Sequence, residues 1–205
     1  TFADGERLCV IQDSATFVFD EQFTCLRDYE HQRPDTKIFQ RMSGMAGSKN
    51  GVYAATEAHG TEALVHVDMD TLAILAEYHP GGACKFGEIA VDPSSGLLLY
   101  AQVSHSERQW SEIAVFDTRT LQPIWYFGRE EFGAAAFCDH HRRGLAVGFN
   151  EVYVGDPRRS CIHVFSFAGQ HLREIRGEWL HACNLCVVYD RLYVLDASVD
   201  ERGRM

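Results

Sequence analysis

Positive charge is scarce in this sequence. Its 205 residues include 19 Lys and Arg against 29 Asp and Glu, which gives a formal net charge of −10 at pH 7. Nonspecific binding to nucleic acid depends on Lys and Arg side chains that neutralise phosphates. The charge balance therefore argues against a nucleic-acid partner, although a local basic cluster could override it.

Long hydrophobic runs are also missing. No apolar run approaches the roughly 18 residues that a membrane-spanning helix needs. The chain opens with the letters TFADG, without the basic start and apolar core of a signal peptide and without an initiator Met. We therefore expect no membrane partner.

Recognisable catalytic motifs are absent as well. The sequence contains no GxSxG, no HExxH and no Gly-rich phosphate loop. We therefore expect no catalytic residues. Several carboxylates lie at the ends of apolar runs, and we interpret them as turn residues that accept backbone N–H bonds. These residues are Asp13, Asp92, Asp156 and Asp196.

Seven cysteines are present, an odd number. Four of them lie inside apolar runs, where a free Cys acts as a small buried hydrophobe: Cys9, Cys25, Cys161 and Cys186. Cys183 and Cys186 form a lone CxxC, but residues three apart on a strand point to opposite faces, which disfavours zinc or a redox pair. We expect free thiols, a reducing compartment such as the cytoplasm, and neither a cofactor nor a metal site.

Short apolar runs, each closed by a turn signal, dominate what is present. The stretch 143–177 contains four of them, at 145–147, 152–154, 161–165 and 172–175. Runs of this length, rich in Val, Tyr, Phe and Ile with period two, predict strands. Four strands joined by such short loops must pair with their sequence neighbours. The stretch therefore predicts a four-stranded antiparallel meander.

The meander recurs along the chain. Its third strand ends at Asp20, Asp68, Asp117 and Ser166, at steps of 48, 49 and 49 residues. Known propeller blades repeat every roughly 40 to 50 residues. A β-sandwich has no fixed period, so the sequence predicts an all-β fold: a β-propeller built of four-stranded antiparallel blades.

A single propeller domain is expected over residues 1–205. About 4–5 blades are present, and their approximate bounds are 1–31, 36–80, 84–128, 134–177 and, in part, 181–205. This number does not comfortably close a ring, and an open end would expose edge strands. We therefore expect the chain to be an incomplete part of a 6- or 7-bladed ring, within the usual range of about 4 to 8 blades.

The most regular blade resembles an NHL repeat. That family has a GLAV-like first strand, a VYV-x-D second strand, an I-x-VF third strand and a G-x-x-x-R closing run. The matching residues here are 144–147, 152–156, 162–165, and Gly169 with Arg173. The blade departs from the pattern at Arg159, Ser160 and Cys161, and the blades at 51–79 and 97–128 look more like the related YVTN-type repeats. The resemblance implies a propeller scaffold but no particular reaction, because one fold hosts many functions.

In a meander blade, the loops between second and third strands and the connections from one blade to the next share one end of the sheet. We call this end the loop face. Aligning the first strands puts four residues at one equivalent position around the channel mouth: Arg41, Lys85, His141 and His181. The loops add Arg108, Trp110, Arg158, Arg159 and Trp179. Arg and Trp are typical anchors of protein interfaces, so these residues are the candidate binding residues.

We interpret the chain as a noncatalytic binding module that holds a protein or an acidic peptide on the loop face. The resemblance implies two alternatives: a metal-dependent enzyme of lyase or lactone hydrolase type, and a propeller that binds single-stranded RNA. A zinc site in the channel needs His from several blades in register, and only His141 and His181 match. The net charge disfavours RNA. A scaffold without a discrete site is a further alternative.

Overall fold

The structure is a computed structural model of the chain. The residues that it describes are 8–12, 15–19, 25–30, 42–48, 51–58, 61–68, 71, 73–80, 84–92, 94–104, 110–129, 144–156, 159–177 and 182–196. The elements that lie wholly within these ranges are β-strands. Within them, no helix is long and apolar enough to cross a membrane.

The described residues form five antiparallel sheets, which follow one another in chain order. Sheet 1 consists of β1 (Leu8–Gln12), β2 (Ala15–Phe19) and β3 (Cys25–Glu30). Sheet 2 consists of β4 (Met42–Ser48), β5 (Gly51–Ala58), β6 (Thr61–Val67) and β7 (Ile74–Tyr78). Sheet 3 consists of β8 (Cys84–Asp92), β9 (Leu97–Ser104), β10 (Trp110–Asp117) and β11 (Pro123–Phe127). Sheet 4 consists of β12 (Leu145–Gly148), β13 (Glu151–Asp156), β14 (Cys161–Ser166) and β15 (His171–Arg176), and sheet 5 of β16 (Ala182–Val188) and β17 (Arg191–Asp196).

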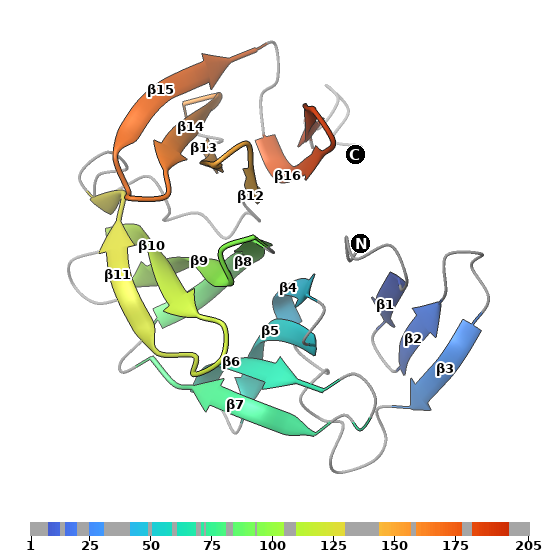
Figure 1. The fold of residues 1–205 in the computed structure, drawn as a ribbon. Helices are drawn as coiled ribbons and strands as arrows, with labels where there is room; N and C mark the ends of the chain where they lie inside the picture. The colour runs from blue at the N-terminus through green and yellow to red at the C-terminus, as the bar shows by residue number, and fades with distance from the viewer. Residues whose placement is uncertain are drawn as a thin grey trace, which may run out of the picture.

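Each sheet is a meander whose strands pair with their sequence neighbours. In sheet 4 the spatial order is β12-β13-β14-β15. Figure 1 shows the sheets set around a common centre as an open arc, with β4, β8, β12 and β16 innermost and β7, β11 and β15 outermost. Sheets 2 to 5 contact one another in chain order through their first strands: β4 contacts β8, β8 contacts β12, and β12 contacts β16. This is the arrangement of blades that the repeat predicts.

A β-bulge recurs at the same point of four sheets. The pairing of the third strand with the fourth shifts register after Val18, His66, Val115 and Val164. These positions are 48, 49 and 49 residues apart, which is the period found in the sequence. A bulge bends the strand and increases its local twist. Its recurrence therefore shapes the outer edge of each sheet in the same way.

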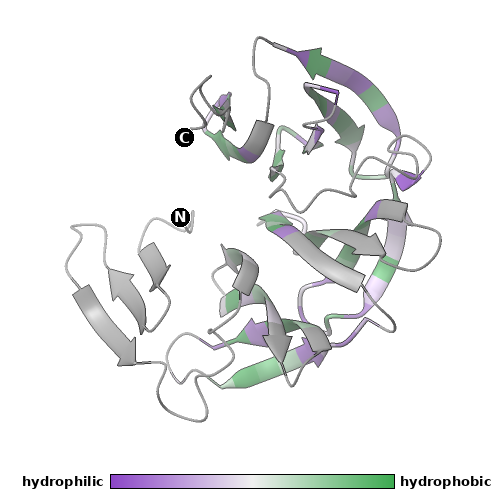
Figure 2. Cartoon of the chain, turned by 180° about the vertical axis from the view of Figure 1, so that it is seen from behind, coloured by the Kyte–Doolittle hydropathy of each residue, from purple (hydrophilic) through white to green (hydrophobic). Residues whose placement is uncertain are grey.

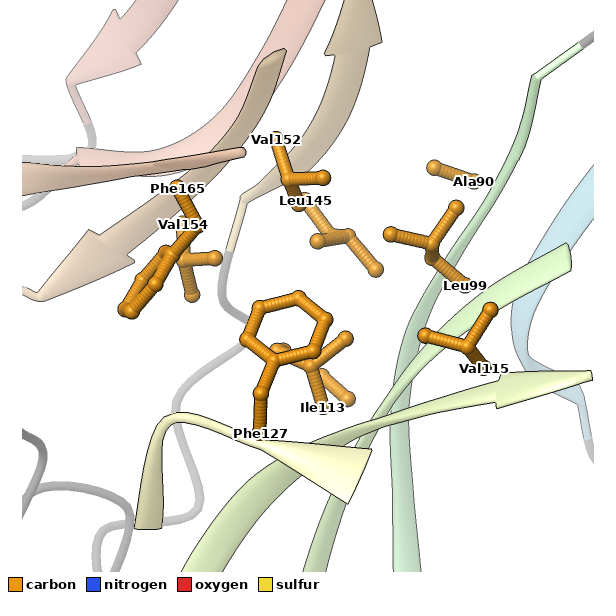
Figure 3. Packing of buried hydrophobic residues seen from close by; sticks show 10 residues of the cluster. Ala90, Leu99, Ile113, Val115, Phe127, Leu145, Val152, Val154 and Phe165 are labelled. Atoms are coloured by element: carbon orange, nitrogen blue, oxygen red, sulfur yellow. The ribbon is translucent and has the colours of Figure 1, made fainter. Parts of the chain in front are cut away.

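Buried side chains fill the space between neighbouring sheets. Val152 and Val154 of β13 face sheet 3, where they belong to one cluster with Phe127 (Figure 3). Tyr153, between them in sequence, faces the other way and packs with Leu185 of sheet 5. A further cluster joins sheets 2 and 3. Because successive side chains of a strand point to opposite faces, both faces of sheet 4 are buried, as in a blade packed between two others.

Glycines permit the close contact between β12 and β16. A Cβ atom at Gly144 would overlap the side chain and backbone of Leu185, and one at Gly148 would overlap the side chain of Val187. Both strands are first strands of their sheets, where consecutive blades approach the common centre. The absence of a side chain at these two positions thus sets how closely sheets 4 and 5 can pack.

The outermost strand of sheet 4 carries polar surface. Figure 2 shows hydrophilic and hydrophobic residues alternating along β15. Ile175 is partly buried against sheet 5, whereas Arg173 and Glu174 are exposed. Solvent therefore reaches sheet 4 along β15, directly beside the buried strand β14.

Two predictions about single residues are wrong. Trp110, which we expected in a loop, is the first residue of β10, because the ladder with β9 extends to the pair Trp110–Ser104. Cys186, expected to be buried, is exposed. It alternates with Leu185 and Val187, which pack on sheet 4, so it lies on the opposite face of β16.

Other predictions about single residues are confirmed. Cys161 is a buried free thiol. The carboxylate of Asp92 accepts hydrogen bonds from the backbone N–H groups of Ser94 and Ser95. The carboxylate of Asp156 accepts one from the backbone N–H of Arg159, 3.1 Å away. The side chains of Asp13, Asp196, Cys9 and Cys25 lie outside the described residues.

Candidate functional site

A cluster of chemically active side chains lies in sheet 4. Asp156 ends β13 and Cys161 begins β14, and the two residues are direct cross-strand partners. His163 lies two residues further along β14 and therefore points to the same face as Cys161. Glu174 of β15 is directly opposite His163, and His171, the first residue of β15, is opposite Phe165 on the other side of the bulge. We call these five residues the β14 cluster.

His163 is the centre of the β14 cluster. Its Nε2 atom lies 3.3 Å from Asp156 Oδ2 and 3.8 Å from Cys161 Sγ. Its Nδ1 atom lies 3.2 Å from His171 Nε2 and 3.9 Å from Glu174 Oε1. Each ring nitrogen thus faces two groups that can bind a proton or a metal ion. The cluster forms two overlapping sets of such groups around one imidazole.

Burial differs sharply across the β14 cluster. Asp156, Cys161 and His163 are each at most 1% exposed, whereas His171 is half-buried and Glu174 exposed. Phe165 covers one side, with its ring centroid 5.2 Å from that of His171. The Nε2 side of His163 is therefore dry, and the Nδ1 side opens toward solvent along β15.

The environment changes the acidity of two groups. Burial by itself raises the pKa of Asp156, but hydrogen bonds from His163 and from the Arg159 backbone N–H outweigh it and hold the pKa below its usual value. Burial raises the pKa of the Cys161 thiol to about 11, and the charges of Asp156 and Glu174 add to this effect. Cys161 is therefore a protonated thiol at neutral pH and a poor nucleophile.

Most of the candidate binding residues predicted from sequence lie outside the described residues: Arg41, Arg108, His141, Arg158, Trp179 and His181. For Lys85 and Trp110, the structure describes the backbone only. Lys85 of β8 is paired with Val103, and Trp110 of β10 is paired with Ser104, the next residue along β9. The register therefore places these two residues at the same end of sheet 3.

Arg159 occupies the matching end of sheet 4. It follows β13 in the turn that leads into β14, and its side chain is 48% exposed. Its Nε atom lies 3.7 Å from Asp156 Oδ2. The Arg159 guanidinium is therefore partly exposed at the surface, while its backbone N–H and its Nε atom interact with Asp156 within the turn. Whether these residues bind a partner stays a prediction.

The β14 cluster is not predicted from the sequence. There, Asp156 is interpreted as a turn residue and Cys161 as a buried hydrophobe, and the metal ligands considered are the first-strand histidines and the Cys183–Cys186 pair. The sequence does contain a signal, because Cys161 and His163 are two apart on one strand and share a face. The approach of His171 and Glu174 depends on the exact register and bulge of the β14–β15 hairpin, which the sequence does not specify.

Comparisons with known proteins describe the scaffold. The sequence matches no protein-family model, so membership of the NHL or YVTN families is not established. No curated protein sequence matches it either. Solved structures do match: BamB from Moraxella catarrhalis superimposes with a TM-score of 0.56 at 16% identity, over 95% of this chain and 54% of that chain.

Two other structures give the same result. Hydrazine synthase from Kuenenia stuttgartiensis matches with a TM-score of 0.62 at 9% identity, over 97% of this chain and 70% of that chain. Apo AztD from Citrobacter koseri matches with a TM-score of 0.57 at 15% identity, over 89% and 47%. These structures are β-propeller-like. The chain has a β-propeller fold. At these identities the likeness concerns the fold alone, and the chain spans about half the length of BamB.

Proposed function

We propose that the chain is a noncatalytic binding module that recognises a protein through an acidic segment docked on the loop face. The observation that carries this proposal is the register of sheets 3 and 4. It sets Lys85, Trp110 and Arg159 at the same end of their sheets. Cationic and aromatic residues at one end of the sheets of an otherwise acidic protein are suited to bind carboxylates and bury apolar area.

The scaffold supports this role. Side chains on both faces of sheet 4 are buried against neighbouring sheets, so its strands form a rigid base. Functional loops typically lie on such a base. The remaining candidate binding residues belong to the same proposal: Arg41, Arg108, His141, Arg158, Trp179 and His181. The free thiols of Cys161 and Cys186 support a reducing, cytoplasmic location for the interaction.

The test is a comparison of two charge-reversed proteins in a pull-down from native extract. The first carries Lys85→Glu and Arg158→Glu, which leave the Arg159–Asp156 pair intact. The matched control carries Arg119→Glu and Arg191→Glu, which reverse two exposed charges in or beside turns at the opposite end of the sheets. We expect a protein that is retained by the parent and the control and lost by the first variant.

Two further results are expected of the retained protein. The parent must still retain it after nuclease treatment, and the purified partner must bind more weakly as salt is added, since the contact is ionic. Equal retention by both charge-reversed proteins would contradict the proposal. Capture that disappears with nuclease would also contradict it and would favour the RNA alternative.

A further inference from the structure

We propose that His163 Nδ1, His171 Nε2 and Glu174 Oε1 bind a divalent transition-metal ion, best fitted by zinc, between β14 and β15. This site is separate from the loop-face residues and from the channel, because it lies on the third and outermost strands of one blade. Two imidazoles and a carboxylate are a common ligand set for zinc, and three protein ligands leave one position for water.

The distances support this assignment. Zinc–nitrogen and zinc–oxygen bonds of about 2.0 to 2.1 Å in a tetrahedral arrangement place the ligand atoms about 3.3 Å apart. His163 Nδ1 and His171 Nε2 are 3.2 Å apart. Glu174 Oε1 lies 3.9 Å from His163 Nδ1, and its side chain, 29% exposed, can close the difference by a small rotation.

Asp156 holds His163 in the orientation that this site needs. Asp156 Oδ2 lies 3.3 Å from His163 Nε2, so the buried carboxylate accepts the Nε2–H hydrogen bond. In this tautomer the lone pair of Nδ1 points toward His171 and Glu174. A carboxylate that accepts the second N–H of a metal-binding histidine is the usual outer partner of such ligands. Asp156 is therefore a positioning residue.

The opposite set of groups, Asp156 with Cys161 and His163 Nε2, is less suited to an ion. Its three residues are almost fully buried and leave no room for a fourth ligand from solvent. Arg159 Nε, a cation, lies 3.7 Å from Asp156 Oδ2.

Charges on the proposed side are more favourable. Arg176 pairs with Glu174 through the other carboxylate oxygen, Oε2, and leaves Oε1 toward His163. Arg176 is 64% exposed, so the pair is largely solvated. Solvent reaches His171 and Glu174 along β15, which provides a path for the ion. Without metal, the same atoms form a hydrogen-bonded Asp156–His163–His171 chain, which is the competing explanation.

The experiment is a titration of the full chain, freed of metal by a chelator, with Zn²⁺ alone in a calorimeter. The test variants are His171→Gln and Glu174→Gln, both on the solvent-accessible side, with circular dichroism to confirm folding. The controls are Cys161→Ser and His79→Ala. His79 is matched because it lies 3.6 Å from Glu77 in a comparable His–Glu pair on the outer part of sheet 2.

We expect one Zn²⁺ ion to bind the parent and both controls with equal affinity. His171→Gln and Glu174→Gln should each weaken this binding at least tenfold, and Asp156→Asn should weaken it by about 10- to 100-fold. Three results would overturn the assignment. They are an absence of stoichiometric binding, unchanged binding in both test variants, and loss of binding in Cys161→Ser with retention in His171→Gln. The last would move the ion to the Asp156–Cys161 side.

Discussion

The hydroxyl of Tyr53 donates a hydrogen bond to the carbonyl oxygen of Thr118, 3.0 Å away, although the two residues are 65 positions apart. Tyr53 lies in β5 of sheet 2, and Thr118 lies in the turn after β10 of sheet 3. Thr118 in turn donates its hydroxyl and its backbone N–H to the carbonyl oxygen of Gly96, in the turn before β9. Two turns of one sheet are therefore tied to a buried ring of the preceding sheet.

Removal of this hydroxyl should weaken the contact between sheets 2 and 3. Tyr53 is fully buried, so Tyr53→Phe leaves the Thr118 carbonyl without this donor. We expect the free energy of unfolding to fall by about 1 kcal/mol, measured by urea denaturation. Tyr126→Phe is the control, because Tyr126 is 46% exposed and its change should be close to zero. If the two substitutions lower the free energy of unfolding equally, the buried hydrogen bond does not contribute measurably to stability.

Gly148→Ala should separate sheets 4 and 5. The added methyl group would overlap the side chain of Val187, and overpacking of a core by one carbon costs about 1 to 3 kcal/mol. A second substitution, Val187→Ala, should recover part of this loss because the three atoms nearest to the added methyl group all belong to that side chain. The same second substitution should not rescue Gly144→Ala, whose methyl group meets Leu185. If the losses of unfolding free energy from Gly148→Ala and Val187→Ala simply add in the double variant, the two side chains are not in direct contact.

Alkaline solution should destabilise the fold through Tyr153. Burial, followed by the hydrogen bond to Glu151 and the charge of that carboxylate, raises the pKa of Tyr153 to about 12. The unfolded chain ionises this group near pH 10, so it releases the proton first. Stability should therefore fall between about pH 10 and pH 12, by up to about 1.4 kcal/mol per pH unit from this group.

Tyr153→Phe removes that contribution. Its unfolding free energy, measured by urea denaturation at several pH values, should show a shallower decline above pH 10 than the parent does. Glu151→Gln should lower the pKa of Tyr153, because the Glu151 carboxylate favours the protonated hydroxyl. Parallel pH profiles for the parent and Tyr153→Phe would show that Tyr153 does not carry this dependence.

Alkylation should distinguish two cysteines of the native chain. Cys186 is exposed, whereas Cys161 is fully buried and the pKa of its thiol is raised to about 11. Iodoacetamide at neutral pH should modify Cys186 and leave Cys161 unmodified until the protein is unfolded. Peptide mapping by mass spectrometry measures both sites in one sample. Early modification of Cys161 would contradict the burial of β14.

Much of the fold could be predicted from the sequence, because strands and turns are coded locally. Alternating apolar residues such as Ile162 and Val164 mark a strand, and polar turns such as Asp117–Thr120 close it. Their period of 48 or 49 residues follows from the repeated blade. The exposure of Cys186 could not be predicted in the same way, because it depends on which face of sheet 5 has a neighbour.

The β14 cluster could not be predicted because it depends on pairing between strands. The bulge between Val164 and Phe165 shifts the register, so that Phe165 pairs with His171 and His163 with Glu174. A shift of one residue would turn these side chains to the other face. Local sequence patterns do not determine such a shift, and the relevant residue types also have ordinary structural roles at strand ends.

The contacts between first strands have a mechanical consequence. They join sheets that are consecutive along the chain, so a force applied to the two ends would load the blades in series rather than in parallel. Extension of a single molecule should then proceed in steps, each releasing one blade. A blade of 48 or 49 residues corresponds to a gain in contour length of about 160 to 170 Å. The blades would therefore unfold one at a time under force, and each step would extend the chain by the length of one blade.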